Sequence, residues 1–376
     1  MSKQRFSCWL FLVLVAQGFW CPRGQCAAEK LSQRCSLQVG EFKRAYRLYV
    51  PPTYDGSTPW PLVLVFHGRF QNTRDVERMA DFTTEADRQR FLIAYPIGIH
   101  GHWNDGRKVM PIGGARNYDD VGFVKALLAH LTATMTVDPN RIYATGMSNG
   151  GMFVQRLACE LSGTFAAIGP VSGTLPSDIA PRCAPQEPVS VIEFHGTKDA
   201  YTHWQGGTIR ALGGRTLSVP QTISHWRRVN GCSGQAQIAY LAHHDPEEDA
   251  TKVRWERSSP CHGGSEVVLY SVEGGGHTWP GGEEDHSLPF LGRVTHDVSA
   301  SQTILDFFVQ HPKSTQDSMA PLPLPQTPTD RHQAPTPPLV PLPVLSRLLS
   351  SPFTLASEWI GAVLSLGGVS EADEIP

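Results

Sequence analysis

One serine of this sequence stands in a setting that suits a nucleophile. Ser148 is the centre of a Gly-x-Ser-x-Gly motif, Gly146 to Gly150, which follows a β-rich run at residues 141–145 and precedes a helix-like run from Gly151. A tight strand-to-helix turn raises a serine hydroxyl above a sheet, and small flanking residues leave room for that turn. The motif predicts Ser148 as a nucleophile; the alternative is a serine in an ordinary turn between a strand and a helix.

A serine hydroxyl attacks efficiently only when a base takes its proton, and in this setting the base is a histidine late in the chain. His277 follows three glycines, which come directly after a β-rich run at residues 266–272. Such a glycine run lets a loop turn over the edge of a sheet and present the imidazole. His195 is the main rival, but it precedes the candidate acid in the chain, which is the wrong order. The sequence therefore predicts His277 as the base.

The third member of such a set is an acid that orients the imidazole and stabilises its protonated form. Asp199 follows the β-rich run at residues 189–194 by a short loop, where the acid is expected. The rival acids lie in polar loops with no strand directly before them: Asp178, Asp245 and Asp249. Asp199 is the predicted acid, and a turn-forming aspartate is the alternative.

The reaction also needs donors for the negative oxygen that develops on the substrate carbonyl. The backbone N–H of Asn149, directly after the nucleophile, is one candidate, and a second comes from the loop after an early strand. The run at residues 61–66 is followed by His67, Gly68 and Arg69, so the backbone N–H of Arg69 is the second candidate. We interpret His67 as a structural loop residue rather than a second base.

The elements that must hold these residues alternate between apolar β-rich runs and helix-like stretches. Continuous apolar strands separated by helices predict an α/β protein with a mostly parallel, twisted sheet covered by helices on both faces. The expected strands are residues 44–50, 61–66, 91–95, 141–145, 166–171, 189–194 and 266–272, and the expected helices are 121–135, 152–161 and 303–309.

Charge and composition exclude several classes of partner. The 376-residue chain carries a formal net charge of −3, which favours neither nucleic acid nor an anionic membrane surface. No set of His, Cys and Asp has the spacing of a zinc site, and no glycine loop that cradles phosphate is present, so we expect no metal and no cofactor.

The two ends of the chain differ from its middle. Lys3 and Arg5 precede a short apolar run and small residues up to Ala28, which predicts a cleaved signal peptide at 1–28 and a secreted or periplasmic protein; an uncleaved anchor is the alternative. We expect a catalytic domain at 29–312. A proline-rich linker follows at 313–345, and a short tail at 346–376 has the spacing of an amphipathic helix but not the length of a membrane span.

Five cysteines remain after the predicted signal peptide: Cys35, Cys159, Cys183, Cys232 and Cys261. An oxidising compartment favours two bridges and one remaining thiol. The pair at 232 and 261 flanks a polar, hairpin-like segment and is the favoured bridge, with the pair at 159 and 183 second. A buried, reduced Cys159 is the alternative to the second bridge.

Several stretches together resemble a known family. They include RAYRLYVPP, VFHG, RIYATGMSNGG, FHGTKD and GGGHTWPGG, and they run from about residue 36 to residue 310. In these stretches, the chain resembles the secreted polyhydroxybutyrate depolymerase-like and feruloyl or acetyl xylan esterase-like α/β-hydrolases. The resemblance implies an α/β-hydrolase fold and the roles given above to Ser148, Asp199 and His277.

The resemblance also implies a function. We expect a secreted serine esterase that hydrolyses carboxylic esters through an acyl-enzyme, with feruloyl or acetyl esters of polysaccharides, or short polyhydroxyalkanoate esters, as substrates. A serine peptidase of the same fold is one alternative. A catalytically idle module, tethered to a surface and binding a polymer, is another.

Three residues near the predicted site raise further expectations. The family usually has a small residue or cysteine where this chain has Arg69, whose side chain would crowd the mouth of the site or favour a negatively charged substrate. Trp103 and Trp279 lie in loops at the predicted mouth. Each would either stack on a sugar or aromatic ring of the substrate or cover the loop beneath it.

Overall fold

A computed structural model describes residues 32–108, 118–209, 213–243, 250–283 and 290–313. The predicted signal peptide, proline-rich linker and tail lie outside the described residues. The chain divides into two units, residues 1–322 and 323–376, and the second lies wholly outside the described part.

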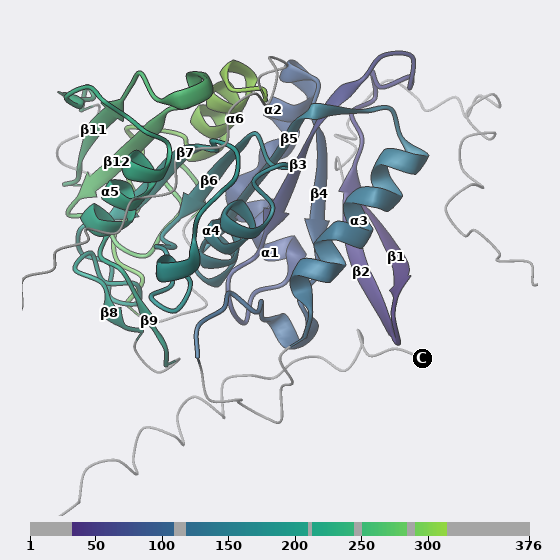
Figure 1. The fold of residues 1–376 in the computed structure, drawn as a ribbon, viewed down its shortest axis with the longest axis horizontal. Helices are drawn as coiled ribbons and strands as arrows, with labels where there is room; N and C mark the ends of the chain where they lie inside the picture. Colours follow the sequence, from purple (N-terminus) through teal and green to yellow (C-terminus); the bar gives the residue numbers. More distant parts are fainter. Residues whose placement is uncertain (1–31, 109–117, 210–212, 244–249, 284–289, 314–376) are drawn as a thin grey trace, which may run out of the picture. The chain divides into compact units, whose positions relative to one another are not determined.

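The core of the first unit is one twisted sheet, which has ten strands within the described residues (Figure 1). Their order across the sheet is β1-β2-β4-β3-β5-β6-β7-β12-β11-β10. The six strands from β4 to β12 run parallel, and antiparallel strands continue the sheet at both edges. The strands are β1 (Gln33–Val39), β2 (Phe42–Tyr49), β3 (Trp60–Phe66), β4 (Leu92–Pro96), β5 (Val137–Met147), β6 (Ala167–Val171), β7 (Ser190–Gly196), β10 (Gln237–Tyr240), β11 (Lys252–Ser258) and β12 (Val267–Glu273). A separate small sheet pairs β8 (Gly207–Thr208) with β9 (Arg215–Thr216).

Helices cover both faces of the large sheet. They are α1 (Thr73–Ala80), α2 (Phe82–Gln89), α3 (Asp120–Thr134), α4 (Asn149–Glu160), α5 (Val219–Val229) and α6 (Ala300–Gln310), with short 3₁₀ turns at Ile99–Gly101, Ala180–Arg182 and His262–Gly264. Apolar residues of α3, α4 and α5 share one core cluster, and those of α1, α2 and α6 share the other. The sheet is therefore sandwiched, and α3, α4 and α5 lie in front of it in Figure 1.

Strand β3 is buried on both of its faces. Its residues alternate between the two cores: Leu62 and Leu64 enter one, and Val63 and Val65 enter the other. All are fully buried, and each such side chain stabilises the fold by about 1.5–3 kcal/mol. A continuous apolar run is what a strand needs when helices cover both of its faces.

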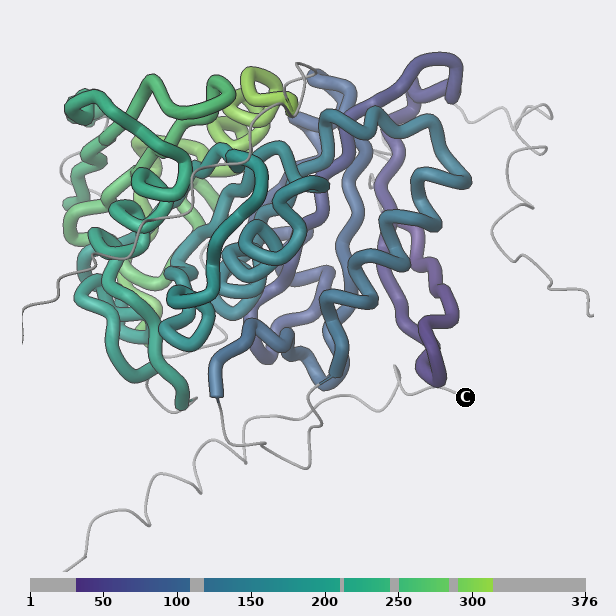
Figure 2. Tube along the Cα trace, viewed as in Figure 1, coloured from purple at the N-terminus to yellow at the C-terminus, as the bar shows by residue number. Residues whose placement is uncertain are grey.

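The last helix closes the domain against an early one. In Figure 2 the yellow-green α6 lies beside the blue α2, although more than 200 residues separate them in the chain. The side-chain amide of Gln89 donates to Asp306 Oδ1 over 2.8 Å across this contact. The C-terminal end of the described domain is thereby fixed to its first third.

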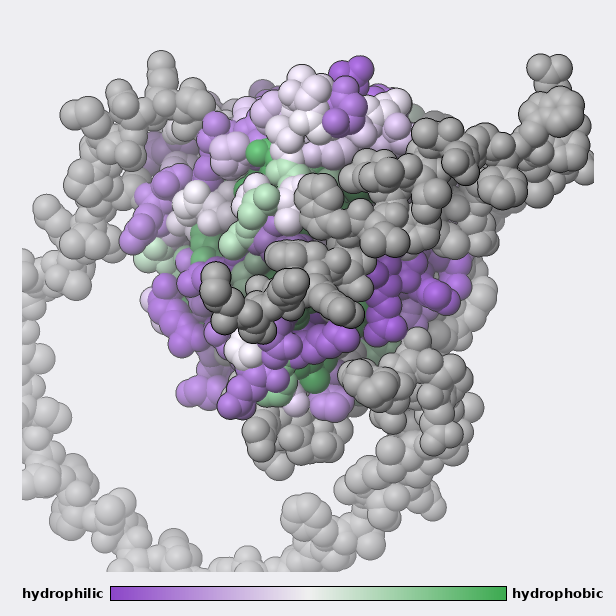
Figure 3. Space-filling model, turned by 90° about the vertical axis from the view of Figure 1, so that its right-hand side faces the viewer, coloured by the Kyte–Doolittle hydropathy of each residue, from purple (hydrophilic) through white to green (hydrophobic). Residues whose placement is uncertain are grey.

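The edge at β1 is polar. This strand exposes Gln33, Arg34, Ser36 and Gln38, and the face turned to the viewer in Figure 3 is mostly hydrophilic where it is not covered by grey atoms. Polar and charged side chains on an edge strand disfavour pairing with another molecule.

Two disulfides pin the segments around α4 and α5. They join Cys159 to Cys183 and Cys232 to Cys261, the two pairings that the sequence favoured. Cys35 belongs to neither bridge and is buried in β1. The segment between the second pair is the antiparallel hairpin of β10 and β11.

The α/β-hydrolase fold predicted from the sequence is confirmed, with the expected strands and helices present. Elements not predicted from the sequence are β1, β10 and β11, which are antiparallel strands toward the sheet edges, the short strands β8 and β9, and the helices α1, α2 and α5. Strand β10 is exposed along its whole length, so it lacks the apolar pattern that reveals a buried strand. Within the described part of the chain, no helix combines the length and apolar character needed to cross a membrane.

Candidate active site

Ser148 occupies a strained turn between β5 and α4. Its φ is 55° and its ψ is −117°, a conformation that costs a non-glycine residue about 1–3 kcal/mol. Two backbone hydrogen bonds hold it: its N–H donates to Val171 O over 2.9 Å, and its carbonyl accepts from Met152 N–H over 2.9 Å. A Cβ at Gly146 would lie 2.6 Å from Phe66 O, so the turn requires glycine there. This is the backbone geometry that a nucleophile elbow requires.

His277 and Asp199 meet at the same end of the sheet. Asp199 lies in the loop after β7, His277 lies in the loop after β12, and these two strands are neighbours and parallel. His277 Nδ1 lies 2.7 Å from Asp199 Oδ2, and both side chains are buried. The second oxygen, Oδ1, accepts from the N–H groups of Tyr201 and Thr202, each over 2.8 Å.

These partners decide the charge state of the Asp199 carboxyl. Burial by itself would raise its pKa, but the charge and hydrogen bond of His277, followed by the charge of His195, outweigh burial and lower that pKa. The carboxylate is ionised at neutral pH and holds the proton of His277 on Nδ1. Nε2 is therefore left as the basic nitrogen.

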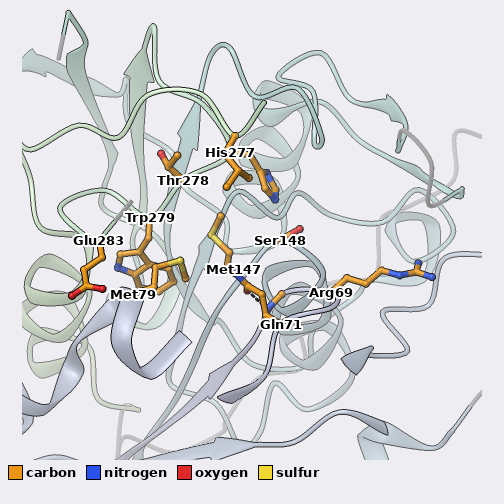
Figure 4. A pocket seen from close by; sticks show the side chains of 11 residues that line it. Arg69, Gln71, Met79, Met147, Ser148, His277, Thr278, Trp279 and Glu283 are labelled. Atoms are coloured by element: carbon orange, nitrogen blue, oxygen red, sulfur yellow. Dashed lines mark hydrogen bonds between the residues drawn. The ribbon is translucent and has the colours of Figure 1, made fainter. Parts of the chain in front are cut away.

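Ser148 and His277 line one pocket. Figure 4 shows the imidazole of His277 directed toward the Ser148 hydroxyl. The remaining lining residues are Gly68, Arg69, Gln71, Met79, Met147, Thr278, Trp279, Glu283 and Leu291. The hollow is partly open to solvent. The structure thus brings together three residues that the sequence singled out from distant parts of the chain.

The predicted oxyanion donors lie on the two loops beside the serine. Asn149 is the first residue of α4, so its backbone N–H has no acceptor within the helix. Its side chain is buried and donates to Asp105 Oδ2 over 2.7 Å. On the other loop, the N–H groups flanking that of Arg69 are engaged: Gly68 donates to Gln71 Oε1 over 2.9 Å, and Phe70 donates to Gly101 O over 3.0 Å.

Comparison with known proteins fits this arrangement. The model of the family described as Esterase PHB depolymerase matches residues 44–201. The chain is 30% identical over 276 residues to the putative esterase NocK of Nocardia uniformis subsp. tsuyamanensis, covering 71% of this chain and 79% of that protein. The chain belongs to the Esterase PHB depolymerase family. It is a carboxylic ester hydrolase.

Two fungal relatives of this esterase are more distant and longer. Feruloyl esterase B of Piromyces equi is 26% identical over 232 residues, which are 60% of this chain and 41% of the relative. The bifunctional acetylxylan esterase/xylanase XynS20E of Neocallimastix patriciarum is 25% identical over 260 residues, which are 69% of this chain and 35% of the relative. This chain therefore spans less than half of either protein.

The two tryptophans predicted at the mouth of the esterase site have different positions. Trp103 is 0% exposed, stacks on Phe153 with ring centroids 5.3 Å apart, and donates its indole N–H to His67 O over 3.0 Å. Both the ring and the N–H of Trp103 are thus occupied within the core, which favours the second expected role, that of covering the loop beneath it. Trp279 is 1% exposed but lines the pocket, and its indole N–H donates to Ser301 Oγ over 3.0 Å. Trp279 forms a fixed wall of the pocket.

His67 is a structural residue of the loop that carries Arg69. Its Nε2 accepts from Gly98 N–H over 3.0 Å, so the ring proton is on Nδ1, which donates to Gly68 O over 2.7 Å. Burial lowers the pKa of His67 to about 4. The neutral ring therefore braces the loop at neutral pH and is not available as a base for the substrate.

A second layer of buried polar groups, not predicted from the sequence, lies behind Asp199. His195 Nε2 donates to Thr202 O over 2.7 Å and lies 3.4 Å from Asp199 Oδ2, while its Nδ1 lies 3.7 Å from Glu193 Oε1. Burial opposes the charge of His195, but the carboxylates of Glu193 and Asp199 outweigh it and raise the pKa of His195. His195 thus contacts Asp199 in the interior and is not among the residues that line the pocket with Ser148. Glu193, a charged residue within an apolar strand, was the available signal.

Most of the pocket wall was also missed. Met79 comes from α1, and Glu283 and Leu291 come from the long segment before α6. Nothing in their local sequence marks them as site residues, since tertiary packing alone brings them to Ser148. Among the described residues, no group of His, Cys, Asp and Glu could hold a metal ion.

Proposed function

We propose that this protein is a secreted serine esterase in which Ser148, His277 and Asp199 form the catalytic triad. The observation that carries the proposal is the His277–Asp199 pair at 2.7 Å, whose imidazole faces a serine held in a strained turn within the same pocket. A serine at such a turn, a base within its pocket and an acid that fixes the tautomer of the base are the parts that acyl transfer requires.

In the first step, Ser148 Oγ attacks the carbonyl carbon of the ester while its proton passes to His277 Nε2. The carbonyl oxygen becomes negative and accepts hydrogen bonds from the backbone N–H groups of Asn149 and Arg69. The carbonyl then re-forms, the bond to the alcohol oxygen breaks, and His277 gives its proton to that oxygen. The acyl group remains on Ser148.

In the second step, His277 takes a proton from a water molecule that attacks the acyl-enzyme. The same donors stabilise the second oxyanion, and the acid leaves as Ser148 regains its proton from His277. Asp199 stays ionised throughout, because its role is to orient the imidazole and to balance the charge of the imidazolium.

The names of the relatives support a substrate class for this proposal. One is a feruloyl esterase and another an acetylxylan esterase/xylanase, so we propose feruloyl or acetyl esters of polysaccharides, or short polyhydroxyalkanoate esters, as substrates. Secretion is proposed from the signal-like residues 1–28, and the two disulfides agree with an oxidising compartment. We further propose that residues 313–345 tether the catalytic domain to the tail.

A fluorophosphonate probe tests the mechanism directly, since it labels an activated serine. The wild-type protein should be labelled and Ser148→Ala should not, while Ser172→Ala serves as a control for a buried serine outside the pocket. A wild-type protein that is folded but never labelled would contradict the proposal.

A substrate panel separates the remaining alternatives. Ferulate, acetylated xylan and hydroxybutyrate esters should be hydrolysed in preference to peptide anilides, because the proposal assigns the site to esters. Hydrolysis of anilides at rates similar to those of esters would favour a peptidase. Binding to insoluble xylan or polyester without hydrolysis would favour a tethered binding module.

A further inference from the structure

Two of the three guanidinium nitrogens of Arg69 have no hydrogen-bond acceptor among the described residues. Arg69 is 9% exposed, and these two atoms, Nε and Nη1, are buried. Its described contact is the ring of Phe70, with the guanidinium carbon 5.0 Å from the ring centroid. Arginine does not lose its proton at neutral pH, so burial leaves a cation that favours a bound anion.

The neighbouring charges do not neutralise this cation. The nearby carboxylate of Asp105 is paired with Arg107, whose Nη2 lies 2.7 Å from Asp105 Oδ2, and both groups are buried. Asp105 also accepts from Asn149 Nδ2 over 2.7 Å. Burial, and after it the positive charge of Arg107, lowers the pKa of the Arg69 guanidinium. The cluster therefore holds two arginines and a single carboxylate that is already shared.

Arg69 lies in the lining of the pocket that contains Ser148, so its charge is near the place where a substrate would react. Figure 4 shows its side chain on the side of Ser148 that faces away from Met79 and Trp279. On the side of Ser148 opposite Arg69, the pocket wall is mainly apolar, with Met79, Met147 and Trp279 among its residues. An ester bound at Ser148 would thus meet an apolar wall on one side and a cation on the other.

We propose that Arg69 is a specificity-determining residue that binds a carboxylate of the substrate, so that the enzyme prefers esters bearing an anionic group near the scissile bond. The inference rests on the proposed function and names the substrate class of that site. A guanidinium can donate hydrogen bonds to a carboxylate, and Arg69 lines the same pocket as Ser148. The Arg69 backbone N–H serves the oxyanion and is independent of this side-chain role.

Two pairs of esters test the proposal with the wild-type protein. Mono-p-nitrophenyl succinate and its methyl ester differ in charge on the acyl half, and 4-acetoxybenzoate and its methyl ester differ in charge on the alcohol half. We expect kcat/KM to favour the anionic member of at least one pair by roughly 10- to 100-fold, the size of a charge-assisted hydrogen bond. The pair that responds tells which half of the substrate faces Arg69. Equal rates within both pairs would overturn the proposal.

Substitution assigns the preference to the residue. In Arg69→Met the ratio of kcat/KM for the anionic and neutral members should fall toward one, whatever happens to the absolute rates. Arg69→Lys should retain part of the preference. Arg74→Met is the matched control, since Arg74 is an exposed arginine at the start of α1 and its removal changes net charge equally. A similar fall of the ratio in Arg74→Met would mean that overall charge, and not Arg69, sets the preference.

Thermal unfolding supplies a readout that does not depend on turnover. Arg69→Met removes a buried, unpartnered charge, so the melting temperature should rise by about 2 °C or more. A clear fall would show that the guanidinium is paired within the protein, and the proposal would be wrong.

A binding measurement keeps this inference distinct from the proposed function. If the wild-type protein hydrolyses neutral esters but shows no preference for anionic ones, the inference fails and the esterase stands. If no ester is hydrolysed, the proposed function fails, and calorimetry with 4-acetamidobenzoate against 4-acetamidobenzamide decides the inference. The carboxylate should bind more tightly to the wild-type protein and lose that advantage in Arg69→Met; equal binding of the two compounds would reject it.

Discussion

Replacing Asp199 by asparagine tests the triad more sharply than removing the acid, because the shape of the side chain is kept. In the wild-type protein, Oδ2 faces His277 Nδ1 and Oδ1 accepts from the N–H groups of Tyr201 and Thr202. Those two backbone donors will hold the amide oxygen of Asp199→Asn at the Oδ1 position. The amide NH₂ must then face His277 and donate to Nδ1, which moves the imidazole proton to Nε2. The atom that should accept the proton of Ser148 is thereby blocked.

The magnitude follows from the cost of the opposite amide orientation. Turning the amide to restore the active tautomer would set its NH₂ against the two backbone donors, at about 1–3 kcal/mol for each unsatisfied N–H. Loss of the carboxylate charge beside the imidazolium adds about 1.5–3 kcal/mol. The sum is centred near 6 kcal/mol, which corresponds to a fall of about 10⁴- to 10⁵-fold in kcat/KM. This agrees with the loss known for the same exchange in another serine hydrolase fold.

The assay is hydrolysis of p-nitrophenyl acetate at pH 7, with circular dichroism and thermal unfolding to establish that the variant is folded. Asp178→Asn is the matched control. Asp178 accepts a hydrogen bond from Lys108 N–H over 3.1 Å, outside the pocket, so its kcat/KM should stay within about twofold of wild type. A folded Asp199→Asn protein that keeps kcat/KM within tenfold of the wild-type value would refute the assigned role of the acid.

Three further predictions concern stability. Burial lowers the pKa of His67 from 6.5 to about 4, so the unfolded chain binds this proton at a higher pH than the folded protein does. About 3 kcal/mol of the free energy of unfolding should therefore be lost as pH falls from 6.5 to 4. In urea titrations, His67→Gln should remove this part of the pH dependence of the free energy of unfolding, and an unchanged pH dependence would contradict the prediction. His195 titrates in the opposite sense, since its pKa is raised. Its contribution to the free energy of unfolding is complete below pH 6.5 and is lost as pH rises through its folded-state pKa. His195→Gln should therefore flatten the dependence of stability on pH in that range, and a steeper decline would speak against this prediction. Cys232→Ser together with Cys261→Ser opens a bridge with a sequence separation of 29 residues and should lower the free energy of unfolding by about 3–4 kcal/mol; a loss under 1 kcal/mol would indicate that the bridge adds little.

Much of the fold could be predicted from the sequence because it depends on local constraints. Strands such as β3 are buried on both faces, so their apolar residues are continuous and visible in the sequence. The edge hairpin of β10 and β11 was interpreted only as a polar, hairpin-like segment, because exposed strands carry no apolar pattern. Helix α5 was missed although its N-cap Ser218 forms a capping box with Gln221, a signal that was present in the sequence.

The sequence by itself determined the candidates for the chemistry. A serine between glycines, a histidine after a glycine run and an aspartate after a strand each reflect a backbone requirement within a few residues, and their order along the chain matched one type of fold. Tertiary structure alone decided the rest. It buried Trp103 in the core, set His195 behind Asp199, and left two nitrogens of the Arg69 guanidinium without an acceptor among the described residues. Burial and charge pairing depend on distances between segments far apart in the chain, as in the 78 residues that separate Asp199 from His277, and local sequence patterns do not contain those distances.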